Sequence, residues 1–332
     1  MADRDETLKP EIISLPKKEW LGKEIKPMSL DEVEGLMRQL YGAVLAFDDY
    51  AYTTTRGVRH LLDDKSHDYA RLPPLKHESA MQIFKSLKPG DEWLDLGCGS
   101  GTFIAGVLKD VNAKIKATGY DARKWGEEED IPELILGDID RVDKSMFPKH
   151  PRGFDLITSA SVFYHLPDYW GALAKSVNLL KPNGRIIIST IVRPLSRDVP
   201  INDEKGEFIK DPEKYWVSYY RNRNIFDVDG KLMSMAEAVR IINSHNPGFK
   251  LEYHSGENEN VTLGEQSYGG GFSGKKPDTK PIDLSNIFYC FYPDRSSSGA
   301  IGITDISFIV ARSREEVDRL KREGFVSVQD RL

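Results

Sequence analysis

The chain has 332 residues, of which 39% are hydrophobic and 30% are charged, and its formal net charge is −6. This balance is typical of a globular protein with a sizeable core, and the length favours one large domain with insertions. The acidic charge argues against a surface that wraps phosphate backbones, although a local basic patch could still contact nucleic acid.

The cysteine and hydropathy patterns bear on the cellular compartment. The two cysteines, Cys98 and Cys290, cannot build a disulfide framework and favour a reducing compartment. No apolar run approaches the roughly 20 residues that cross a bilayer, and the charged segment from Met1 to Lys18 lacks the apolar core of a secretory signal. These features predict a cytoplasmic protein without membrane contact.

Residues 1–75 are predicted to form a polar arm followed by a helical cap. Ser29 and Glu32 have the spacing of a capping box, which starts a helix. Apolar residues at three- and four-residue spacings continue this helix to about Phe47. A second helix is expected over 77–87, at the start of the next region.

The middle region, 76–195, alternates between strands and helices. Strands are expected at 93–96, 115–120, 134–136, 154–158 and 185–192, with helices at 103–108 and 169–180. Strands separated by helices are typical of βαβ units, which build a mainly parallel sheet covered on both faces.

Residues 196–332 are predicted to complete the sheet around two insertions. The insertions, at 194–230 and 256–300, are rich in aromatic residues and turn formers. In the second, the glycines from Gly269 to Gly274 are interpreted as a flexible loop or lid. Between and after the insertions we expect a helix at 234–244, strands at 249–253 and 306–311, and a closing helix capped by Ser313. The expected fold class is α/β: a doubly wound, mainly parallel seven-stranded sheet with an N-terminal helical cap and insertions.

A glycine-rich segment follows the first strand of the middle region. Gly97, Gly99 and Gly101 come directly after this strand and just before a helix. Glycine lacks a Cβ, so the backbone can take positive φ and a ligand can lie against it. The helix N-terminus offers unpaired N–H groups to an anionic group. Asp121 ends the next strand, about one βαβ unit after Asp95, where a carboxylate can accept hydrogen bonds from ribose hydroxyls.

The glycine spacing separates two kinds of nucleotide site. The dinucleotide fingerprint G-x-G-x-x-G places its third glycine where this chain has Thr102. Here the third glycine, Gly101, comes one residue earlier, and Asp95 stands just ahead of the glycines. This arrangement resembles motif I of the class I (Rossmann-like) S-adenosylmethionine-dependent methyltransferases.

Further segments within 76–195 resemble the same family in the same order. Residues 119–121 resemble its ribose-binding acidic position, and residues 136–139 resemble the segment that contacts the adenine. Residues 154–168 resemble the fourth strand with the loop beyond it, and residues 180–185 resemble the entry to the fifth strand.

The resemblance implies that S-adenosylmethionine is the cofactor. The cofactor-binding residues that it implies are Asp95, Gly97, Gly99, Gly101, Asp121, Asp138, Ile139 and Ser159. Asp95 is expected either to bind the methionine amine or to order the loop. Asp121 is expected to lie open to water at its strand end, so that its loss would weaken binding and leave the fold intact. The segment 124–130 departs from the family, because it lacks a clear amphipathic helix.

His165 is the candidate catalytic residue. It follows the strand whose end is expected to face the methyl donor, and a histidine with a near-neutral pKa can take a proton from a nucleophile. A structural role is the alternative, and Tyr164 and His254 are weaker candidates. Two aromatic groups could line an acceptor pocket or pack beneath the insertions. They are Tyr215, Trp216, Tyr219 and Tyr220, and Phe288, Tyr289, Phe291 and Tyr292.

These features predict direct methyl transfer to a small-molecule acceptor, with no metal. The sequence shows neither the Asn/Asp-Pro-Pro-aromatic signature of amine methylation on nucleic acids nor the paired-glutamate loop of protein arginine methyltransferases. RNA remains an alternative acceptor through Arg221 and Arg223, and a protein acceptor is a second. A third alternative is a cofactor-binding relative that works as a regulator or scaffold. The sequence does not predict an oligomeric state.

Overall fold

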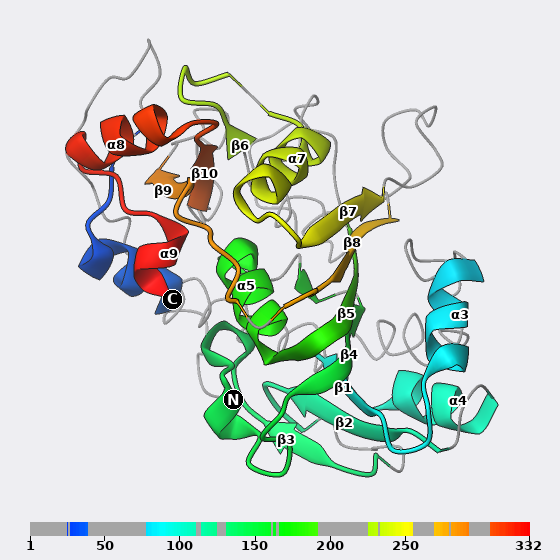
Figure 1. The fold of residues 1–332 in the computed structure, drawn as a ribbon. Helices are drawn as coiled ribbons and strands as arrows, with labels where there is room; N and C mark the ends of the chain where they lie inside the picture. Colours follow the sequence, from blue (N-terminus) through cyan, green and yellow to red (C-terminus); the bar gives the residue numbers. More distant parts are fainter. Residues whose placement is uncertain are drawn as a thin grey trace, which may run out of the picture. The chain divides into compact units, whose positions relative to one another are not determined.

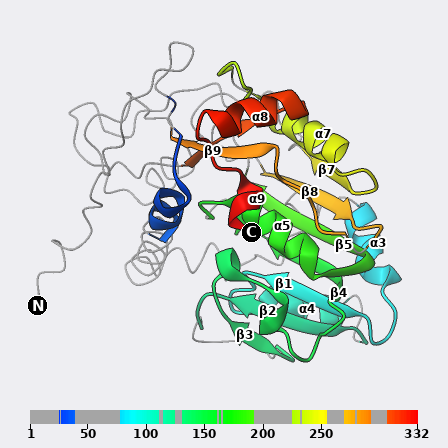
Figure 2. The ribbon, with the colours of Figure 1, turned by 60° about the vertical axis from the view of Figure 1, so that its left-hand side comes forward.

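The structure is a computed structural model, drawn from two sides in Figure 1 and Figure 2. It describes residues 25, 27–38, 78–110, 114–124, 131–160, 162–163, 166–191, 225–231, 233–254, 269–278, 280–291 and 306–332. None of the helices in these ranges is long and apolar enough to span a membrane.

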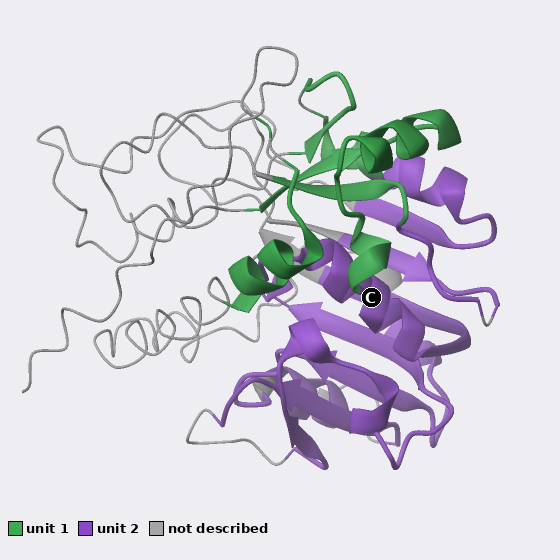
Figure 3. Ribbon diagram, turned by 90° about the vertical axis from the view of Figure 1, so that its left-hand side faces the viewer, with its two compact units in different colours: residues 1–60, 193–238, 285–331 green, residues 61–192, 239–284, 332 purple. Residues whose placement is uncertain are grey.

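The chain divides into two compact units, which are coloured separately in Figure 3. The larger unit comprises residues 61–192 and 239–284 with Leu332, and the smaller unit comprises residues 1–60, 193–238 and 285–331. The division into 1–75, 76–195 and 196–332 stays a prediction.

The larger unit contains a seven-stranded sheet in the order β3-β2-β1-β4-β5-β8-β7. Its strands are β1 (Glu92–Leu96), β2 (Lys116–Asp121), β3 (Leu134–Leu136), β4 (Phe154–Ala160), β5 (Leu180–Ile191), β7 (Lys250–His254) and β8 (Gly269–Lys275). Neighbours from β3 to β5 pair in parallel, whereas β8 is antiparallel to both β5 and β7. The predicted mainly parallel, seven-stranded α/β sheet is therefore confirmed.

The segments that form the last two strands of this sheet differ from the prediction. The segment expected at 249–253 is the edge strand β7, but its sheet partner is the glycine-rich β8, which the sequence had suggested to be a loop or lid. The segment expected at 306–311 is β10 (Ile306–Val310), which lies in a different sheet. Glycine has a low strand propensity. β8 forms nevertheless, because its backbone pairs with β5 along its whole length and with β7 over residues 271–275.

Helices cover the sheet on both faces. They are α3 (Glu78–Ser86), α4 (Thr102–Asp110) and α5 (Tyr169–Leu179), together with α7 (Met235–His245), which spans the boundary between the units. Ile187 belongs to the core cluster beneath α3 and α4. Successive strand residues point to opposite faces, so Ile188 and its β8 partner Phe272 face the other way. On that side Phe272 lies 6.2 Å from Trp170 of α5, measured between ring centroids.

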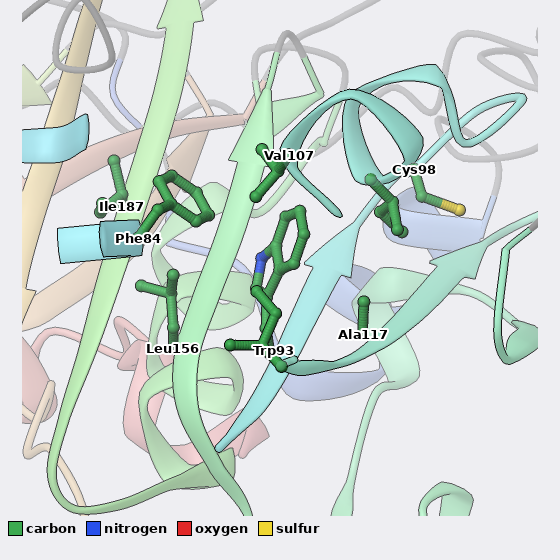
Figure 4. Packing of buried hydrophobic residues seen from close by; sticks show 9 residues of the cluster. Phe84, Trp93, Cys98, Val107, Ala117, Leu156 and Ile187 are labelled. Atoms are coloured by element: carbon green, nitrogen blue, oxygen red, sulfur yellow. The ribbon is translucent and has the colours of Figure 1, made fainter. Parts of the chain in front are cut away.

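Aromatic packing holds α3 and α4 against β1. Figure 4 shows Phe84 and Trp93 within the buried cluster at this place. Trp93 of β1 is fully buried, and its ring lies edge-on to Phe84 of α3 at 5.1 Å and to Phe103 of α4 at 5.5 Å. Such edge-to-face pairs add about 0.5–1.5 kcal/mol each beyond the area they bury. This packing fixes the start of α4, and with it the glycine loop that connects β1 to α4.

An ionic cluster lies where β1, β4 and β5 begin. The Lys181 ammonium is 2.7 Å from Asp155 and 3.0 Å from Glu92, and all three side chains are mostly buried. Partial burial alone would lower the pKa of Lys181, but the hydrogen bonds to Asp155 and Glu92 outweigh it and raise the pKa. The cation therefore keeps two neighbouring carboxylates together at this edge of the sheet.

Removing that cation is expected to destabilise the larger unit. In Lys181→Met, two partly buried carboxylates lose their shared donor, which should lower the free energy of unfolding by about 1–3 kcal/mol. Urea denaturation at neutral pH measures the change. The matched control is Lys149→Met, because the Lys149 side chain is 75% exposed although it pairs with Glu133 at 2.9 Å. An exposed pair contributes at most about 1 kcal/mol, so equal losses in the two variants would contradict the prediction.

The smaller unit has its own sheet, in the order β6-β10-β9, with β6 at Ile225–Phe226 and β9 at Ile287–Phe291. Its core includes Phe226, Phe288 and Ile309, and Leu320 from the closing helix α8 (Arg314–Arg322), which Ser313 caps as predicted. The chain ends with α9 (Val328–Arg331).

The start of the N-terminal helix is also seen in the smaller unit. Residues 30–38 are helical. The backbone N–H of Ser29 donates to Glu32 at 2.7 Å, and that of Glu32 donates to the Ser29 hydroxyl at 3.3 Å. The predicted capping box is therefore confirmed. The rest of the predicted helical cap lies outside the described residues.

Candidate cofactor-binding site

The loop between β1 and α4 turns on three glycines. Gly97, Gly99 and Gly101 have φ angles of +73°, +57° and +86°, in the region that favours glycine. The backbone N–H groups of Gly97 and Cys98 donate to the carbonyl oxygen of Tyr120 on β2, at 2.7 and 3.2 Å. The loop is therefore tied to the end of the neighbouring strand, as the spacing of the two segments predicted.

Asp121, the last residue of β2, completes this attachment. Its carboxylate accepts the Gly99 N–H at 2.8 Å and the Arg123 N–H at 3.3 Å. Its exposure is 6%. The expectation that Asp121 lies open to water was therefore wrong: the strand end is covered by the loop, and the carboxylate orders that loop from below.

The three glycines differ in the space around them. A Cβ on Gly97 would lie 2.3 Å from Cγ2 of Val162, and one on Gly101 would lie 2.2 Å from Cγ1 of Ile131. A Cβ on Gly99 would meet nothing within 4 Å. Of the three, Gly99 therefore turns its Cα toward open space, which is the geometry that lets a ligand lie directly on backbone. The loop fits the cofactor that the sequence predicted.

Asp95 lies beneath the loop and is 3% exposed. Its carboxylate accepts the Thr158 hydroxyl at 2.6 Å. Burial raises the pKa of Asp95 to about 7, while the Thr158 hydrogen bond lowers it and the negative charge of Asp121 raises it. Asp95 is thus a carboxyl group that can change protonation near neutral pH at the base of the glycine loop.

Asp138 and Ile139 follow β3, next to the end of β2. The Asp138 carboxylate caps a short 3₁₀ helix, Ile139–Arg141, by accepting the Asp140 N–H at 2.8 Å. The Tyr120 hydroxyl donates to the Asp138 carbonyl oxygen at 3.1 Å, and Ile139 is 3% exposed. These contacts hold the segment at the same edge of the sheet as Asp121. Adenine binding by Asp138 and Ile139 stays a prediction.

Ser159 is fully buried at the end of β4. Its hydroxyl donates to the Leu96 carbonyl oxygen at 2.8 Å and ties β4 to β1. This contact supports the strand ends on which the loop stands, and cofactor contact by Ser159 stays a prediction.

The other predicted site residues divide into three groups. His165 and Tyr164 lie outside the described residues, as do the aromatic residues at 215–220. His254 is the last residue of β7, in register with Gly271. Phe288 and Tyr289 are fully buried in β9 of the smaller unit, which favours core packing for these two. Within the described ranges, no three His, Cys, Asp or Glu side chains gather as metal ligands.

Two contacts at the site were not predicted from the sequence. Thr158 binds Asp95, and Val162 fills the space beside Gly97. Both depend on how β4 is placed beside β1, where Asp95 is in register with Thr158. The signal that could have found Thr158 is a polar side chain directly after the apolar pair Leu156 and Ile157.

Comparison with known proteins agrees with the expected family. A family model described as "Methyltransferase domain" matches residues 67–228. A ubiquinone biosynthesis O-methyltransferase of Actinobacillus pleuropneumoniae is 32% identical over 133 residues, which cover 37% of this chain and 55% of that protein. A 27-O-demethylrifamycin SV methyltransferase of Amycolatopsis mediterranei is 26% identical over 108 residues, covering 31% and 39%.

A further relative is an uncharacterized 37.1 kDa protein of a Streptomyces fradiae transposon. It is 28% identical over 168 residues, which cover 41% of this chain and 47% of that protein. The chain thus spans about half the length of the curated relatives that it matches. Among solved structures, the plantazolicin methyltransferase BpumL in complex with a pentazolic desmethylPZN analog and SAH has a TM-score of 0.45 at 13% identity, covering 75% of this chain and 99% of that one.

The sheet and the glycine loop define a nucleotide-binding α/β domain in the larger unit. The match to a methyltransferase domain at residues 67–228 agrees with the resemblance of this region to the class I (Rossmann-like) S-adenosylmethionine-dependent methyltransferases.

Proposed function

We propose that the protein is an enzyme that transfers a methyl group from S-adenosylmethionine to a nucleophile on a small-molecule acceptor. The observation that carries the proposal is the loop at 97–101. Its Gly99 N–H is held by the Asp121 carboxylate, and its Gly99 Cα faces open space. Such a loop presents backbone to a nucleotide-like ligand at the edge of the sheet where α/β proteins bind ligands.

The chemistry divides between the cofactor and the chain. When bound, S-adenosylmethionine supplies an activated methyl group on a sulfonium. The chain has to bind the cofactor, hold the nucleophile in line and exclude water, which is a contribution of several kcal/mol. In the proposal Asp121 accepts hydrogen bonds from the ribose, Asp138 and Ile139 contact the adenine, and the loop carries the methionine part.

The proposed proton acceptor is His165, for an acceptor group that must lose a proton. Its role is tested by the pH dependence of turnover. With saturating cofactor, turnover of the wild type should show an ionisation that is missing in His165→Ala. An unchanged profile in this variant would assign His165 a structural role.

The small-molecule acceptor is supported by the relatives, whose names refer to ubiquinone biosynthesis and to a demethylrifamycin. Another relative is named a sterol 24-C-methyltransferase, so the methylated atom is not part of the proposal. A cytoplasmic location is part of it, because a chain with two cysteines cannot build a disulfide framework and a reducing compartment suits it.

The test has two stages. Calorimetry should show that S-adenosylmethionine and S-adenosylhomocysteine bind with a Kd of micromolar order, which corresponds to a binding free energy of about −8 kcal/mol. NAD should not bind. Transfer of a labelled methyl group to small-molecule, RNA and protein fractions then identifies the acceptor class. Binding without methyl transfer to any fraction would favour a regulatory or scaffold protein. If neither S-adenosylmethionine nor S-adenosylhomocysteine binds, the proposal is overturned.

A further inference from the structure

Three buried side chains of β1 and β4 form a polar chain that ends at the glycine loop. The Trp93 indole N–H donates to the Thr158 hydroxyl at 2.7 Å, and the Thr158 hydroxyl donates to Oδ1 of Asp95 at 2.6 Å. The exposures of Trp93, Thr158 and Asp95 are 0%, 1% and 3%. Trp93 and Asp95 are two residues apart on β1, so both leave the same face of the strand. Thr158 lies between them, in register with Asp95.

The direction of the first hydrogen bond is fixed by chemistry. An indole N–H can only donate, so the Thr158 oxygen accepts from Trp93. The Thr158 hydroxyl in turn donates to Oδ1 of Asp95. With Oδ1 accepting this hydrogen bond, a proton on the carboxyl group is carried by Oδ2.

The surroundings of Asp95 make its two protonation states similar in free energy. Burial disfavours the carboxylate, and the charged group that acts on it from the neighbouring strand is Asp121, which disfavours it further. Thr158 favours the carboxylate through its hydrogen bond, and the resulting pKa of Asp95 is about 7. Of these three influences, the Thr158 hydroxyl is the one that favours the ionised carboxylate.

We propose that Thr158 and Trp93 are positioning residues that set the protonation of Asp95, so that binding of the ammonium group in the methionine part of the cofactor releases the Oδ2 proton. This inference rests on the proposed function. The step breaks only the O–H bond at Oδ2. The proton passes to the buffer, and the carboxylate then balances the positive charge of the ligand, since a nearby opposite charge favours the ionised form.

Calorimetry with S-adenosylhomocysteine, which carries the same ammonium group, tests the proposal. Titrations at about pH 5.5 to 8.5 in two buffers with different heats of protonation give the number of protons released. In the wild type we expect close to one proton below pH 7 and none above about pH 8. Affinity should rise roughly tenfold per pH unit below the midpoint and level off above it.

Variants of Thr158 separate positioning from simple packing. Thr158→Val keeps the shape but loses the hydroxyl, so the midpoint should move to higher pH and affinity at pH 7 should fall roughly tenfold. Thr158→Ser restores the hydroxyl and should restore the wild-type midpoint. The matched control is Thr118→Val on β2. Thr118 is equally buried, and its hydroxyl pairs with His150 at 3.2 Å. This control should leave the number of released protons and the midpoint unchanged.

A measurement without ligand separates this inference from the proposed function. A carboxyl group whose pKa is raised on folding binds its proton more tightly in the native state, so its contribution to stability falls as pH rises from about 4 to 7. In Thr158→Val the free energy of unfolding should keep falling above pH 7, because the pKa of Asp95 is raised further. When Asp95→Asn is also present, Thr158→Val should not cause this additional fall above pH 7. Urea denaturation against pH measures both.

The outcomes are distinct. If the wild type binds the ligand with no proton release, the inference is wrong and the proposed function stands. If nothing binds at any pH but the Thr158→Val profile depends on Asp95, the proposed function fails and the positioning role of Thr158 stands. Identical pH profiles of stability for Thr158→Val and the wild type would overturn that role.

Discussion

Asp121→Ala is expected to weaken S-adenosylmethionine binding by roughly 10- to 150-fold. The proposed hydrogen bonds from the ribose to this carboxylate are charge-assisted, and such bonds contribute about 1.5–3 kcal/mol. The variant also leaves the Gly99 N–H without the acceptor that it now has at 2.8 Å. We therefore expect an additional loss of about 1–3 kcal/mol in the free energy of unfolding. Paired ligand titrations and urea denaturation measure the two effects.

Asp121→Asn distinguishes the two roles of this residue. The amide keeps an oxygen that can accept the Gly99 N–H, so stability should recover most of the loss, while the charge that strengthens the ribose contacts is gone. If Asp121→Asn binds the cofactor as tightly as the wild type, the ribose is held elsewhere. If Asp121→Ala leaves stability unchanged, the contact with Gly99 contributes nothing to the loop.

The second large effect is expected from Gly97→Ala, which should destabilise the protein by about 2–5 kcal/mol. An alanine at φ +73° costs about 1–2 kcal/mol. Its Cβ would also lie 2.3 Å from Val162, which adds an overpacking cost of about 1–3 kcal/mol. The free energy of unfolding from urea denaturation gives the sum, and Gly97→Ala combined with Val162→Ala should recover the overpacking part alone.

Gly99→Ala is the matched control within the same loop. Its Cβ would meet no atom within 4 Å, so only the conformational cost of about 1–2 kcal/mol applies to folding. The methyl group would, however, enter the space where the cofactor is proposed to lie, so affinity should fall much more than stability. Should Gly99→Ala bind the cofactor normally, the ligand does not approach the loop at this glycine.

The parts of the site that follow from short-range spacing were predictable from the sequence. Three alternating glycines after an apolar strand require a turn with positive φ, and Asp121 ends the next strand one βαβ unit later. The burial of Asp121 was not predictable. It depends on the loop folding back over the strand end, and the residues of β2 do not encode that contact.

Dependence on tertiary contacts also explains why the last two strands of the seven-stranded sheet were predicted wrongly. Ile306–Val310 is a fully buried apolar strand, and its residues do not specify which of two sheets it joins. The residues of Gly269–Lys275 carry almost no strand signal, because glycine contributes no side-chain alternation. Here the strand is created by its partners on either side, and pairing of that kind is a tertiary effect.

The position of β8 has a consequence for the order in which the protein can assemble. β8 comes after β7 in the chain but lies between β5 and β7 in the sheet. During synthesis from the N-terminus, the edge of β5 that contains Ile186, Ile187 and Ile188 cannot pair with β8 until residue 275 has been made. An apolar strand edge of this kind is a template for pairing with another chain. A nascent chain that stalls within residues 255–268 therefore exposes this edge, and fragments that end there should aggregate on release, whereas fragments that include β8 should not.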